Sequence, residues 1–371
     1  MVAEHLDVDR LLADPAIRIV VCCGAGGVGK TTTAAALGVR AAEVHGRRTV
    51  VLTIDPARRL AQSMGLSELD NTPRQVKGID GEHGGELHAM MLDMKRTFDE
   101  VVQQHTTPQR AAEIFANPFY QAMSSTFAGT QEYMAMEKLG QLRSTDEWDL
   151  IVVDTPPSRS ALDFLDAPAR LSRFLDGRML RLLLAPARSG KSMFSLVTAS
   201  FGLFSRTVQK ILGAQLLTDL SGFVAALDSM FGGFRQRADE TYRILQDPQT
   251  AFLLVAAPER DAVREAAYFA ERLVAERMPL GGLVLNRMHK SDISVLASSR
   301  SLEAADALGN EMTADALRIH AALMRQIERE VRVAATFTDA FPDVPAASIT
   351  AQPADVHDVD GLRTIGALLA G

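Results

Sequence analysis

The stretch that most constrains the fold of this chain is the glycine-rich run G-A-G-G-V-G-K-T at residues 24–31. It follows an apolar, β-branched run, I-R-I-V-V-C-C (17–23), and it precedes a run of helix formers at 32–42. Glycines let backbone N–H groups turn inward around phosphate oxygens, and the N-terminus of the helix adds its dipole. The pattern G-x-x-x-x-G-K-[ST] between strand and helix predicts a P-loop rather than a turn without a ligand.

Two side chains of this loop are expected to carry its chemistry. Lys30 should reach the β- and γ-phosphates of a nucleotide, and the hydroxyl of Thr31 should bind Mg²⁺. The other expected nucleotide contacts of the loop are Gly26, Gly27, Val28, Gly29 and Thr32.

A second G-K-S occurs at residues 190–192. The position five residues before Gly190 is Ala185, and Pro186 follows it, so the glycines of a phosphate cradle are missing. We interpret this stretch as an ordinary loop.

Short apolar runs alternate with helical stretches along the chain, and they are continuous rather than alternating with polar residues. Such strands are buried on both faces, as in a parallel sheet covered by helices. The sequence therefore predicts an α/β fold, a doubly wound, mostly parallel sheet of the P-loop NTPase kind. The expected strands are residues 17–23, 48–54, 87–92, 149–154, 251–257, 282–286 and 346–350.

Two regions interrupt this alternation. Residues 94–145 are mostly helical in pattern, and residues 160–247 contain no good strand but hold an apolar series with helical spacing from Leu212 to Phe234. We expect a helical subdomain inserted into the P-loop domain. The P-loop domain would comprise residues 1–93, 146–160 and 248–371, and the helical subdomain residues 94–145 and 161–247.

Asp55 follows the strand expected at 48–54, and Pro56 ends that strand. Ligands of open α/β sheets gather at the carboxyl ends of the strands. A carboxylate at this point can orient an attacking water and accept its proton during phosphoryl transfer. The alternative is a helix N-cap, for which Asp is also favoured.

Asp154 ends the apolar run D-L-I-V-V-D (149–154) and is followed by T-P-P. An Asp at the end of a buried strand is the Walker B arrangement, in which the carboxylate holds Mg²⁺ directly or through water. The alternative is a purely structural Asp, which the presence of a P-loop makes the weaker interpretation.

The composition excludes several classes of protein. The chain has 371 residues and a net charge of −7 without a basic stripe, so nucleic acid is not an expected partner. The N-terminus lacks the pattern of a signal peptide, and no run approaches the ~18 apolar residues of an integral membrane segment. The two cysteines, Cys22 and Cys23, are adjacent in an expected core strand, which indicates a cytoplasmic protein.

With these segments in place, the sequence resembles the ArsA / guided-entry (tail-anchored-protein targeting) ATPase family. These are deviant-Walker-A P-loop ATPases related to ParA and MinD proteins, and the actinobacterial anion-transporting-ATPase-like members show the closer resemblance. The similar motifs are G-G-V-G-K-T-T (26–32), D-P-A-R-R-L (55–60), A-G-T-Q-E (128–132), D-T-P-P-S-R-S-A-L-D-F-L (154–165), V-L-N-R (284–287) and Q-P-A-D-V (352–356).

The resemblance implies ATP or ADP as the ligand, with Asp55 orienting the catalytic water and Thr31 and Asp154 as Mg²⁺ partners. It implies that Asn286 hydrogen-bonds the adenine. Arg287 beside it and the loop with Gln352 and Pro353 belong to the same end of the nucleotide. The resemblance also implies a dimeric switch, in which the nucleotide state changes a surface for a hydrophobic protein client or partner.

One departure from the family pattern concerns residue 25. The family's P-loop has a lysine at this position that reaches the phosphates of the opposite subunit, whereas this chain has Ala25. A cation there would act as an arginine finger does, at roughly 10³–10⁵ in rate. We favour a heterodimer with a lysine-bearing paralogue over a homodimer, and a slow nucleotide sensor is the other reading. Arg58 and Arg159 are candidate substitute cations.

Two cysteine motifs of the family are also absent from this sequence. The C-x-x-C that ties some family dimers through zinc is missing, and so are the cysteine ligands for arsenite, so we expect neither zinc nor arsenite. Two alternative functions stay open, a catalytically weak regulatory subunit and a ParA/MinD-like positioning ATPase. The methionines and Phe201 to Phe204 of the helical subdomain fit either a client groove or the subdomain's own core.

Overall fold

The computed structural model describes residues 4–55, 59–66, 68–118, 120–121, 130–156, 236–237, 239–293 and 295–371. The chain divides into two compact units. The first unit comprises residues 1–92, 142–162 and 243–371, and the second comprises residues 93–141 and 163–242. The two units are described separately below.

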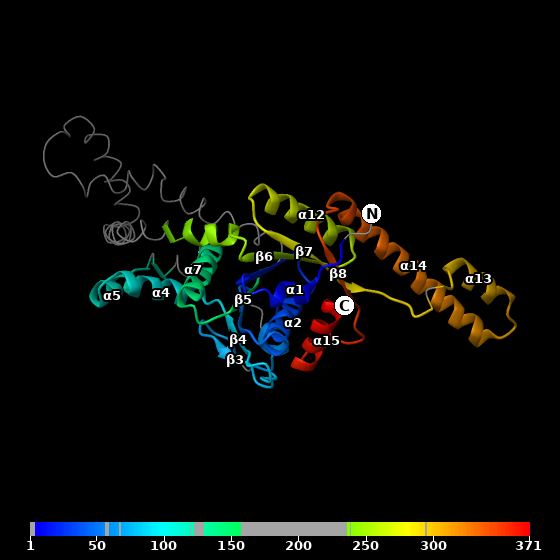
Figure 1. The fold of residues 1–371 in the computed structure, drawn as a ribbon, viewed down its shortest axis with the longest axis horizontal. Coiled ribbons are helices and arrows are strands. Elements are labelled where there is room, and N and C mark those ends of the chain that lie inside the picture. The colour runs from blue at the N-terminus through cyan, green and yellow to red at the C-terminus, as the bar shows by residue number, and fades with distance from the viewer. Residues whose placement is uncertain are drawn as a thin grey trace, which may run out of the picture. The chain divides into compact units, whose positions relative to one another are not determined.

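The first unit is built on one eight-stranded sheet in the order β3-β4-β2-β5-β1-β6-β7-β8 (Figure 1). Every neighbouring pair is parallel except β3 and β4, which are antiparallel. The strands are β1 (Ile19–Cys23), β2 (Arg48–Thr53), β3 (Arg74–Gln75), β4 (Glu86–Met91), β5 (Leu150–Asp154), β6 (Thr250–Ala256), β7 (Leu280–Met288) and β8 (Ala346–Thr350).

The predicted fold class is confirmed, and all seven predicted strands are present with their ends within two residues of the prediction. The central strands β1, β5 and β6 are buried along their whole length, which explains why they are continuous apolar runs. The sequence analysis missed β3, because its two residues are exposed and polar and form an edge. A strand of this kind has no periodicity that a sequence could reveal.

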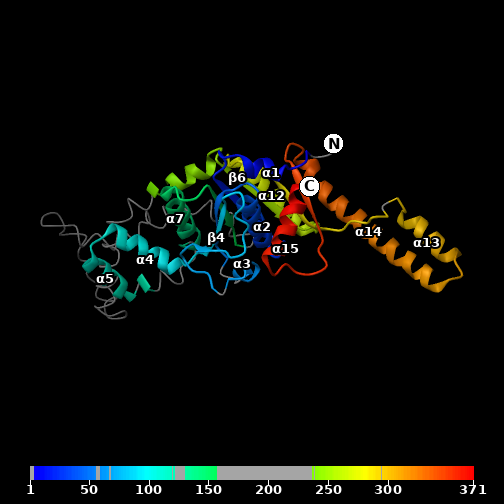
Figure 2. The same ribbon diagram turned by 60° about the horizontal axis from the view of Figure 1, so that its bottom comes forward.

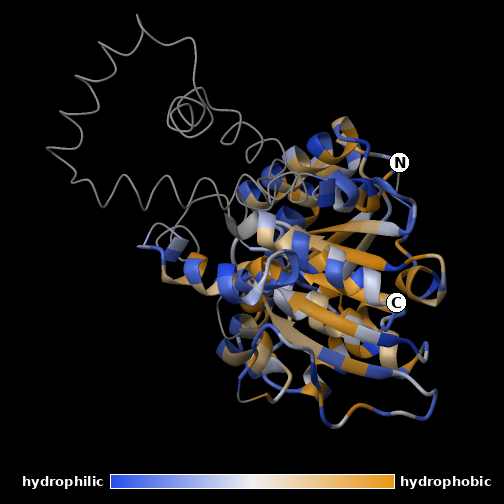
Figure 3. Ribbon diagram, turned by 90° about the vertical axis from the view of Figure 1, so that its left-hand side faces the viewer, coloured by the Kyte–Doolittle hydropathy of each residue, from blue (hydrophilic) through white to orange (hydrophobic). Residues whose placement is uncertain are grey.

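Helices cover both faces of this sheet (Figure 1). On one face lie α1 (Val8–Ala13), α2 (Lys30–Glu43) and α15 (Val359–Ala370), and on the other lies α12 (Arg260–Ala275). The short helix α3 (Arg59–Ser63) packs against α2. Figure 3 shows the strands between the helices as largely hydrophobic, as expected of a sheet buried on both faces.

A long helical hairpin separates β7 from β8. Its helices are α13 (Ser298–Ala307) and α14 (Glu311–Ala340), which lie side by side in Figures 1 and 2. The far end of α14 packs on α12 and β7. Asn310 caps the N-terminus of α14, since its side chain accepts a hydrogen bond from the backbone N–H of Thr313. The sequence analysis did not single out this hairpin.

The described part of the second unit is helical, as the pattern of residues 94–145 predicts. Its helices are α4 (Met94–His105), α5 (Pro108–Ala116) and the first part of α7 (Thr130–Thr145). Asp93 and Thr107 cap α4 and α5. The buried carboxylate of Glu137 accepts a hydrogen bond from Arg237 at 3.0 Å, which joins α7 to the segment before β6.

Several predictions of the sequence analysis fall outside the described residues. They are the apolar series from Leu212 to Phe234, the Phe201 to Phe204 segment, the G-K-S at 190–192, Arg58 and Arg159. Within the described residues, no helix is long and apolar enough to cross a membrane.

Candidate functional site

The candidate site lies where the carboxyl ends of β1, β2 and β5 meet the N-terminus of α2. β5 pairs with both β1 and β2 in the same direction, so the ends of these three strands fall at one edge of the sheet. The strand that follows β1 in the chain, β2, lies toward one edge of the sheet, and the strand that follows β5, β6, lies toward the opposite edge. A crevice at such a point is where open α/β sheets bind their ligands.

Glycine is required at two positions of the loop between β1 and α2. Gly24 has φ +151°, and a Cβ there would lie 2.0 Å from the carbonyl oxygen of Val255 on β6. Gly29 has φ +97°, and a Cβ there would lie 2.1 Å from Nδ2 of Asn286 on β7. The loop therefore packs closely against β6 at Gly24 and against Asn286 of β7 at Gly29, and a side chain at either position would collide with these atoms.

Lys30 is buried inside this loop, with 6% of its surface exposed. Its Nζ donates hydrogen bonds to the carbonyl oxygens of Gly24 at 2.9 Å and Ala25 at 2.8 Å. Burial lowers the pKa of Lys30, and the nearby carboxylates of Asp154 and Asp55 oppose that shift. The ammonium group is held within the loop by the loop's own carbonyls, where a phosphate oxygen would be a stronger partner.

Asp154 is completely buried at the end of β5. Its Oδ2 accepts hydrogen bonds from the hydroxyls of Thr31 at 2.8 Å and Thr53 at 2.9 Å. Its Oδ1 is buried without a hydrogen-bond partner among the described residues. Burial raises the pKa of Asp154 to about 6, although the two hydroxyls and Lys30 pull it down.

A pocket of about 360 Å³ opens beside Lys30 and Thr31, whereas Asp154 lies buried behind Thr31 and is not among the described lining residues. Its floor is the P-loop with Lys30 and Thr31, and Asp55 stands on one side at the end of β2. The residues that line the pocket are Gly27, Gly29, Lys30, Thr31, Thr32, Asp55, Gln62, Ser63, Thr155, Arg287, Asp355, Val356 and His357.

Asn286 contacts the P-loop, whereas the neighbouring Arg287 lines the pocket. The side-chain amide of Asn286 donates to the carbonyl oxygen of Val28 at 2.8 Å, so it ties β7 to the P-loop. Its Oδ1 accepts from the backbone N–H of Arg287 at 2.9 Å. Arg287 is an exposed, non-glycine residue at φ +63°, a conformation that is uncommon outside functional sites and turns.

The loop after β8 contributes to the pocket through residues other than Gln352 and Pro353, the two that the sequence analysis singled out. Asp355, Val356 and His357 line it, whereas Gln352 and Pro353 are not among the described residues that do. The amide of Gln352 instead donates to the carbonyl oxygen of Thr350 at 2.8 Å. The resemblance at 352–356 and the lining of the pocket involve the same loop, but which of its residues line the pocket depends on how the loop folds.

Three further lining residues were also missed, namely Gln62, Ser63 and Thr155. Thr155 directly follows Asp154, and its hydroxyl donates to the carbonyl oxygen of Cys22 at 2.8 Å. Gln62 and Ser63 belong to α3, five residues that start just after the D-P-A segment. In each case the only hint in the sequence was that a polar residue lies close to a motif, Thr155 beside Asp154 and the other two shortly after D-P-A.

Ala25 is largely buried, with 8% of its surface exposed, and belongs to the core cluster below the loop. Its methyl group contacts the protein interior and supplies no charge. Among the described residues that line the pocket, Lys30, Arg287 and His357 are the basic ones.

The residues present fit a magnesium–nucleotide complex. A buried carboxylate oxygen with no partner, next to a threonine hydroxyl, supplies the oxygen ligands that Mg²⁺ prefers. No group of three His, Cys, Asp or Glu side chains in the described part of the chain could hold a metal alone. Mg²⁺ does not need one, because substrate phosphates and waters complete its coordination.

The fold and site together define a P-loop nucleotide-binding protein. The region from β1 to the start of α14 matches a family model: residues 17–315 correspond to the anion-transporting ATPase family, ArsA. The chain therefore belongs to the ArsA ATPase family, and both the predicted family and the predicted enzyme class, an ATPase, are confirmed.

Individual relatives agree with this assignment. The chain is 26% identical over 283 residues to "ATPase GET3" of Malassezia globosa, which covers 75% of this chain and 74% of that protein. It is 24% identical over 291 residues to "ATPase ASNA1 homolog 2" of Paramecium tetraurelia, with 75% and 78% covered. It is 31% identical over 159 residues to a "Putative arsenical pump-driving ATPase" of Prosthecochloris vibrioformis, over 42% of this chain and 37% of that protein.

Proposed function

We propose that this chain binds ATP with Mg²⁺ in the pocket above the P-loop and hydrolyses it to ADP and phosphate. The observation that carries the proposal is the meeting of Lys30, Thr31 and Asp154 at one edge of the sheet, where Asp154 Oδ1 has no hydrogen-bond partner among the described residues. A buried carboxylate oxygen without a partner is costly, and a bound cation would remove that cost.

Thr31 and Asp154 would hold the Mg²⁺, which supplies charge neutralisation of the β- and γ-phosphates when bound. The hydroxyl of Thr53 keeps the second oxygen of Asp154 occupied, so the carboxylate is fixed in orientation. Lys30 would exchange its two carbonyl partners for phosphate oxygens, and the backbone N–H groups of the loop would cradle the same phosphates.

Asp55 is proposed as the residue that orients the attacking water and accepts its proton. It lines the pocket from the end of β2, the strand next to the one that ends in Asp154. A carboxylate in this place touches the reacting water and nothing of the base or ribose, so its removal affects turnover more than binding.

The base of the nucleotide is proposed to lie toward Arg287 and the tip of the loop after β8. Arg287 and His357 offer a planar cation and a ring that stack on a nucleobase, and Asp355 offers an acceptor. Asn286 would serve this end of the site by holding the P-loop in register with β7, through its hydrogen bond to Val28.

We propose further that the chain works as a dimer and favour a heterodimer with a paralogue that carries a lysine at the position of Ala25. The buried methyl of Ala25 leaves this copy without a cation to offer across a dimer. Asp55 is present at the family's water-orienting position, which supports a site that hydrolyses ATP when a partner subunit supplies the cation. A catalytically weak regulatory subunit is the second candidate, favoured by the same buried Ala25.

The coupling of nucleotide state to a hydrophobic protein client is proposed on the family resemblance alone. The residues that would form a client surface lie mostly outside the described part of the chain. The ATPase proposal does not depend on this coupling.

Calorimetric titration of the purified chain with ATP and ADP, with and without Mg²⁺, tests the proposal together with phosphate release. We expect ATP to bind with a Mg²⁺ requirement that Thr31→Ala and Asp154→Asn both remove. Lys30→Ala should abolish binding, and Lys290→Ala, an exposed lysine beyond β7, should not. Equal binding of ATP to the Lys30→Ala variant would contradict the proposal.

A further inference from the structure

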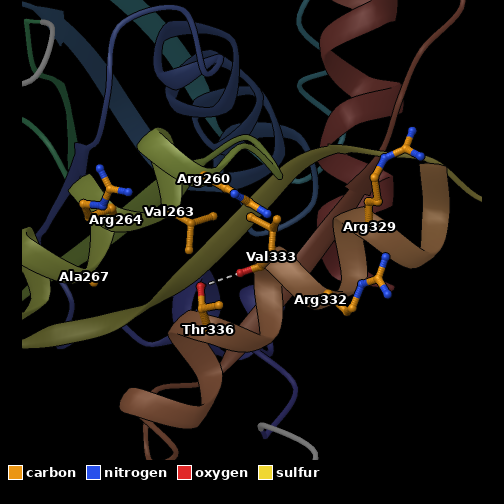
Figure 4. A pocket seen from close by; sticks show the side chains of 8 residues that line it. All are labelled: Arg260, Val263, Arg264, Ala267, Arg329, Arg332, Val333 and Thr336. Carbon is orange, nitrogen blue, oxygen red and sulfur yellow. Dashed lines mark hydrogen bonds between the residues drawn. The ribbon is translucent and has the colours of Figure 1, made fainter. Parts of the chain in front are cut away.

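A second cavity lies between α12 and α14. It has a volume of about 700 Å³ and shares no residue with the described lining of the nucleotide pocket. The residues that line it are Arg260, Val263, Arg264 and Ala267 from α12 and Arg329, Arg332, Val333 and Thr336 from α14 (Figure 4). We call this cavity the arginine groove.

The arginine groove has an apolar floor. Val263 is 2% exposed, and Ala267 and Val333 are partly buried. The hydroxyl of Thr336 donates to the carbonyl oxygen of Val333 at 2.6 Å, so it is already satisfied within its own helix (Figure 4). An apolar side chain of a ligand could pack here without leaving a polar group of the floor unpaired.

The rim of the groove is basic on both sides. Arg260 and Arg264 are four residues apart on α12, and Arg329 and Arg332 are three residues apart on α14, so each pair shares one face of its helix. All four side chains are exposed. Each of the two helices therefore contributes two arginines to the lining of the groove.

These positive charges are poorly compensated within the protein. Among the described residues, Arg260, Arg329 and Arg332 have no ion pair, and none of the residues lining the groove is a carboxylate. Arg264 pairs with Asp261 at 3.2 Å, but both side chains are highly exposed, so the interaction is weak.

Two carboxylates of α14 are adjacent in sequence to Arg329, the exposed Glu328 and the buried Glu330, and Glu330 is already engaged. Glu330 accepts from the backbone N–H of His289 at 2.8 Å and pairs with its ring at 2.7 Å. The amide of Gln326 also donates to it. Some other arginines of this unit are firmly paired, for example Arg363 with Glu43. In a chain of net charge −7, the described lining of the groove holds four arginines and no carboxylate.

We propose that the arginine groove binds a short acidic segment of a partner protein, with one or more apolar side chains on the floor and carboxylates on the rim. Guanidinium groups recognise carboxylates through two parallel hydrogen bonds, which is the recurring way in which arginine clusters bind acidic motifs. The floor of Val263, Ala267 and Val333 matches the apolar part of such a segment and would contribute by burial.

A peptide fits these observations better than a nucleic acid. The described lining contains no aromatic side chain on which a base could stack, and the net charge of −7 disfavours a long polyanion such as a nucleic acid strand. The volume of about 700 Å³ is also larger than a single small anion needs.

Selection of a random twelve-residue peptide library displayed on phage against the full chain tests this proposal. We expect enriched peptides that combine Asp or Glu with Leu, Ile, Val or Phe. Their synthetic forms should bind roughly ten- to a hundredfold more weakly to a variant with Arg329→Gln and Arg332→Gln. Binding to Arg325→Gln should be unchanged, because Arg325 is an exposed arginine of the same helix outside the described lining.

Two further results would support the acidic–apolar match. Replacing the acidic residues of an enriched peptide by their amides should weaken binding as much as the double arginine variant does. Val263→Glu, which places a carboxylate in the floor, should also weaken binding, while circular dichroism shows whether the variant has folded. ATP binding should be the same in the double arginine variant and the unmodified chain, so this test is independent of the nucleotide site.

The proposal is wrong if the enriched peptides lack acidic residues or bind the double arginine variant as well as the unmodified chain. A single-stranded twelve-nucleotide DNA and vesicles of phosphatidylglycerol serve as alternative polyanions. If either binds more tightly than the selected peptides, and does so through Arg329 and Arg332, the occupant is not a peptide and the proposal fails.

Discussion

The hydroxyl of Thr31 donates a 2.8 Å hydrogen bond to the buried carboxylate of Asp154. The two residues are 123 positions apart, one at the start of α2 and the other at the end of β5. This bond brings the two expected magnesium partners together within the protein itself. These two side chains are therefore held next to each other before a ligand binds.

The buried charge of Asp154 predicts a pH-dependent change in stability. The folded-state pKa of about 6 lies above the ordinary value of 3.8, so the folded state holds the proton more tightly. The protonated carboxyl of Asp154 contributes fully to the free energy of unfolding below pH 3.8. This contribution is lost as the pH rises through 6. Without Mg²⁺ or nucleotide, Asp154→Asn should raise the free energy of unfolding at pH 8 by on the order of 2–3 kcal/mol.

Urea unfolding of both proteins between pH 4 and pH 8 measures this effect. The difference between them should grow from pH 4 to pH 6 and then stay constant. Asp343→Asn, an exposed aspartate, provides the control. A stability difference that is the same at pH 4 and pH 8 would show that burial of the Asp154 charge is not its cause.

Asp55→Asn should separate binding from turnover. Asparagine keeps the shape and can still contact a water, but it cannot accept the proton. We expect phosphate release to fall by roughly 10²–10⁴ while the Kd for ATP changes less than about threefold. A parallel loss of ATP affinity, measured by titration calorimetry, would mean that Asp55 belongs to the binding surface and not to the chemistry.

Gly29→Ala should disrupt the P-loop more than alanine substitution at another left-handed glycine. The new Cβ would lie 2.1 Å from Nδ2 of Asn286, whereas Gly78, at φ +79°, has open space around its Cβ position. Gly78→Ala therefore reports backbone strain alone, about 1 kcal/mol. We expect ATP binding to be lost in Gly29→Ala and kept in Gly78→Ala, by calorimetry.

The double variant Gly29→Ala, Asn286→Ala refines this prediction. Removing the amide of Asn286 relieves the collision but leaves the strain at residue 29. In thermal unfolding, the double variant should therefore have a higher melting temperature than Gly29→Ala alone. If the double variant is no more stable than Gly29→Ala alone, the contact between Asn286 and the loop does not limit this position.

Arg287 should contribute to nucleotide affinity, although it is exposed and its backbone is strained at φ +63°. Arg287→Ala and Arg287→Gly should both weaken ATP and ADP binding by roughly tenfold, because both lose the guanidinium. The glycine variant should be more stable than the alanine variant by about 1 kcal/mol, since glycine adopts positive φ without strain. Unchanged nucleotide affinity in both variants would remove Arg287 from the proposed site.

The sheet was predictable because its strands are buried on both faces, so β1, β5 and β6 appear as uninterrupted apolar runs. The P-loop and Asp154 were predictable for a related reason, since their chemistry depends on residues adjacent in sequence to those strands. The edge strand at Arg74–Gln75 could not be predicted, because it has no buried face.

Other parts of the site depend on contacts that no local pattern encodes. Asn286 contacts the P-loop across 258 positions, and its amide bonds to the carbonyl oxygen of Val28. Asp355 to His357 reach the pocket through the path of a loop. The arginine groove arises because α12 and α14 pack together, and neither helix predicts it alone.

We propose that Ala25 deprives this chain of a cation that an ATPase dimer needs. The most direct test is the rate of ATP hydrolysis and the mass, by light scattering, of the unmodified chain and of Ala25→Lys. Ala25→Met serves as the control, because position 25 is only 8% exposed and methionine adds length without charge. We expect the unmodified chain and Ala25→Met to bind ATP but turn over slowly, and Ala25→Lys to hydrolyse faster as a dimer. Rapid hydrolysis by the unmodified homodimer, unaffected by Ala25→Lys, would contradict the claim.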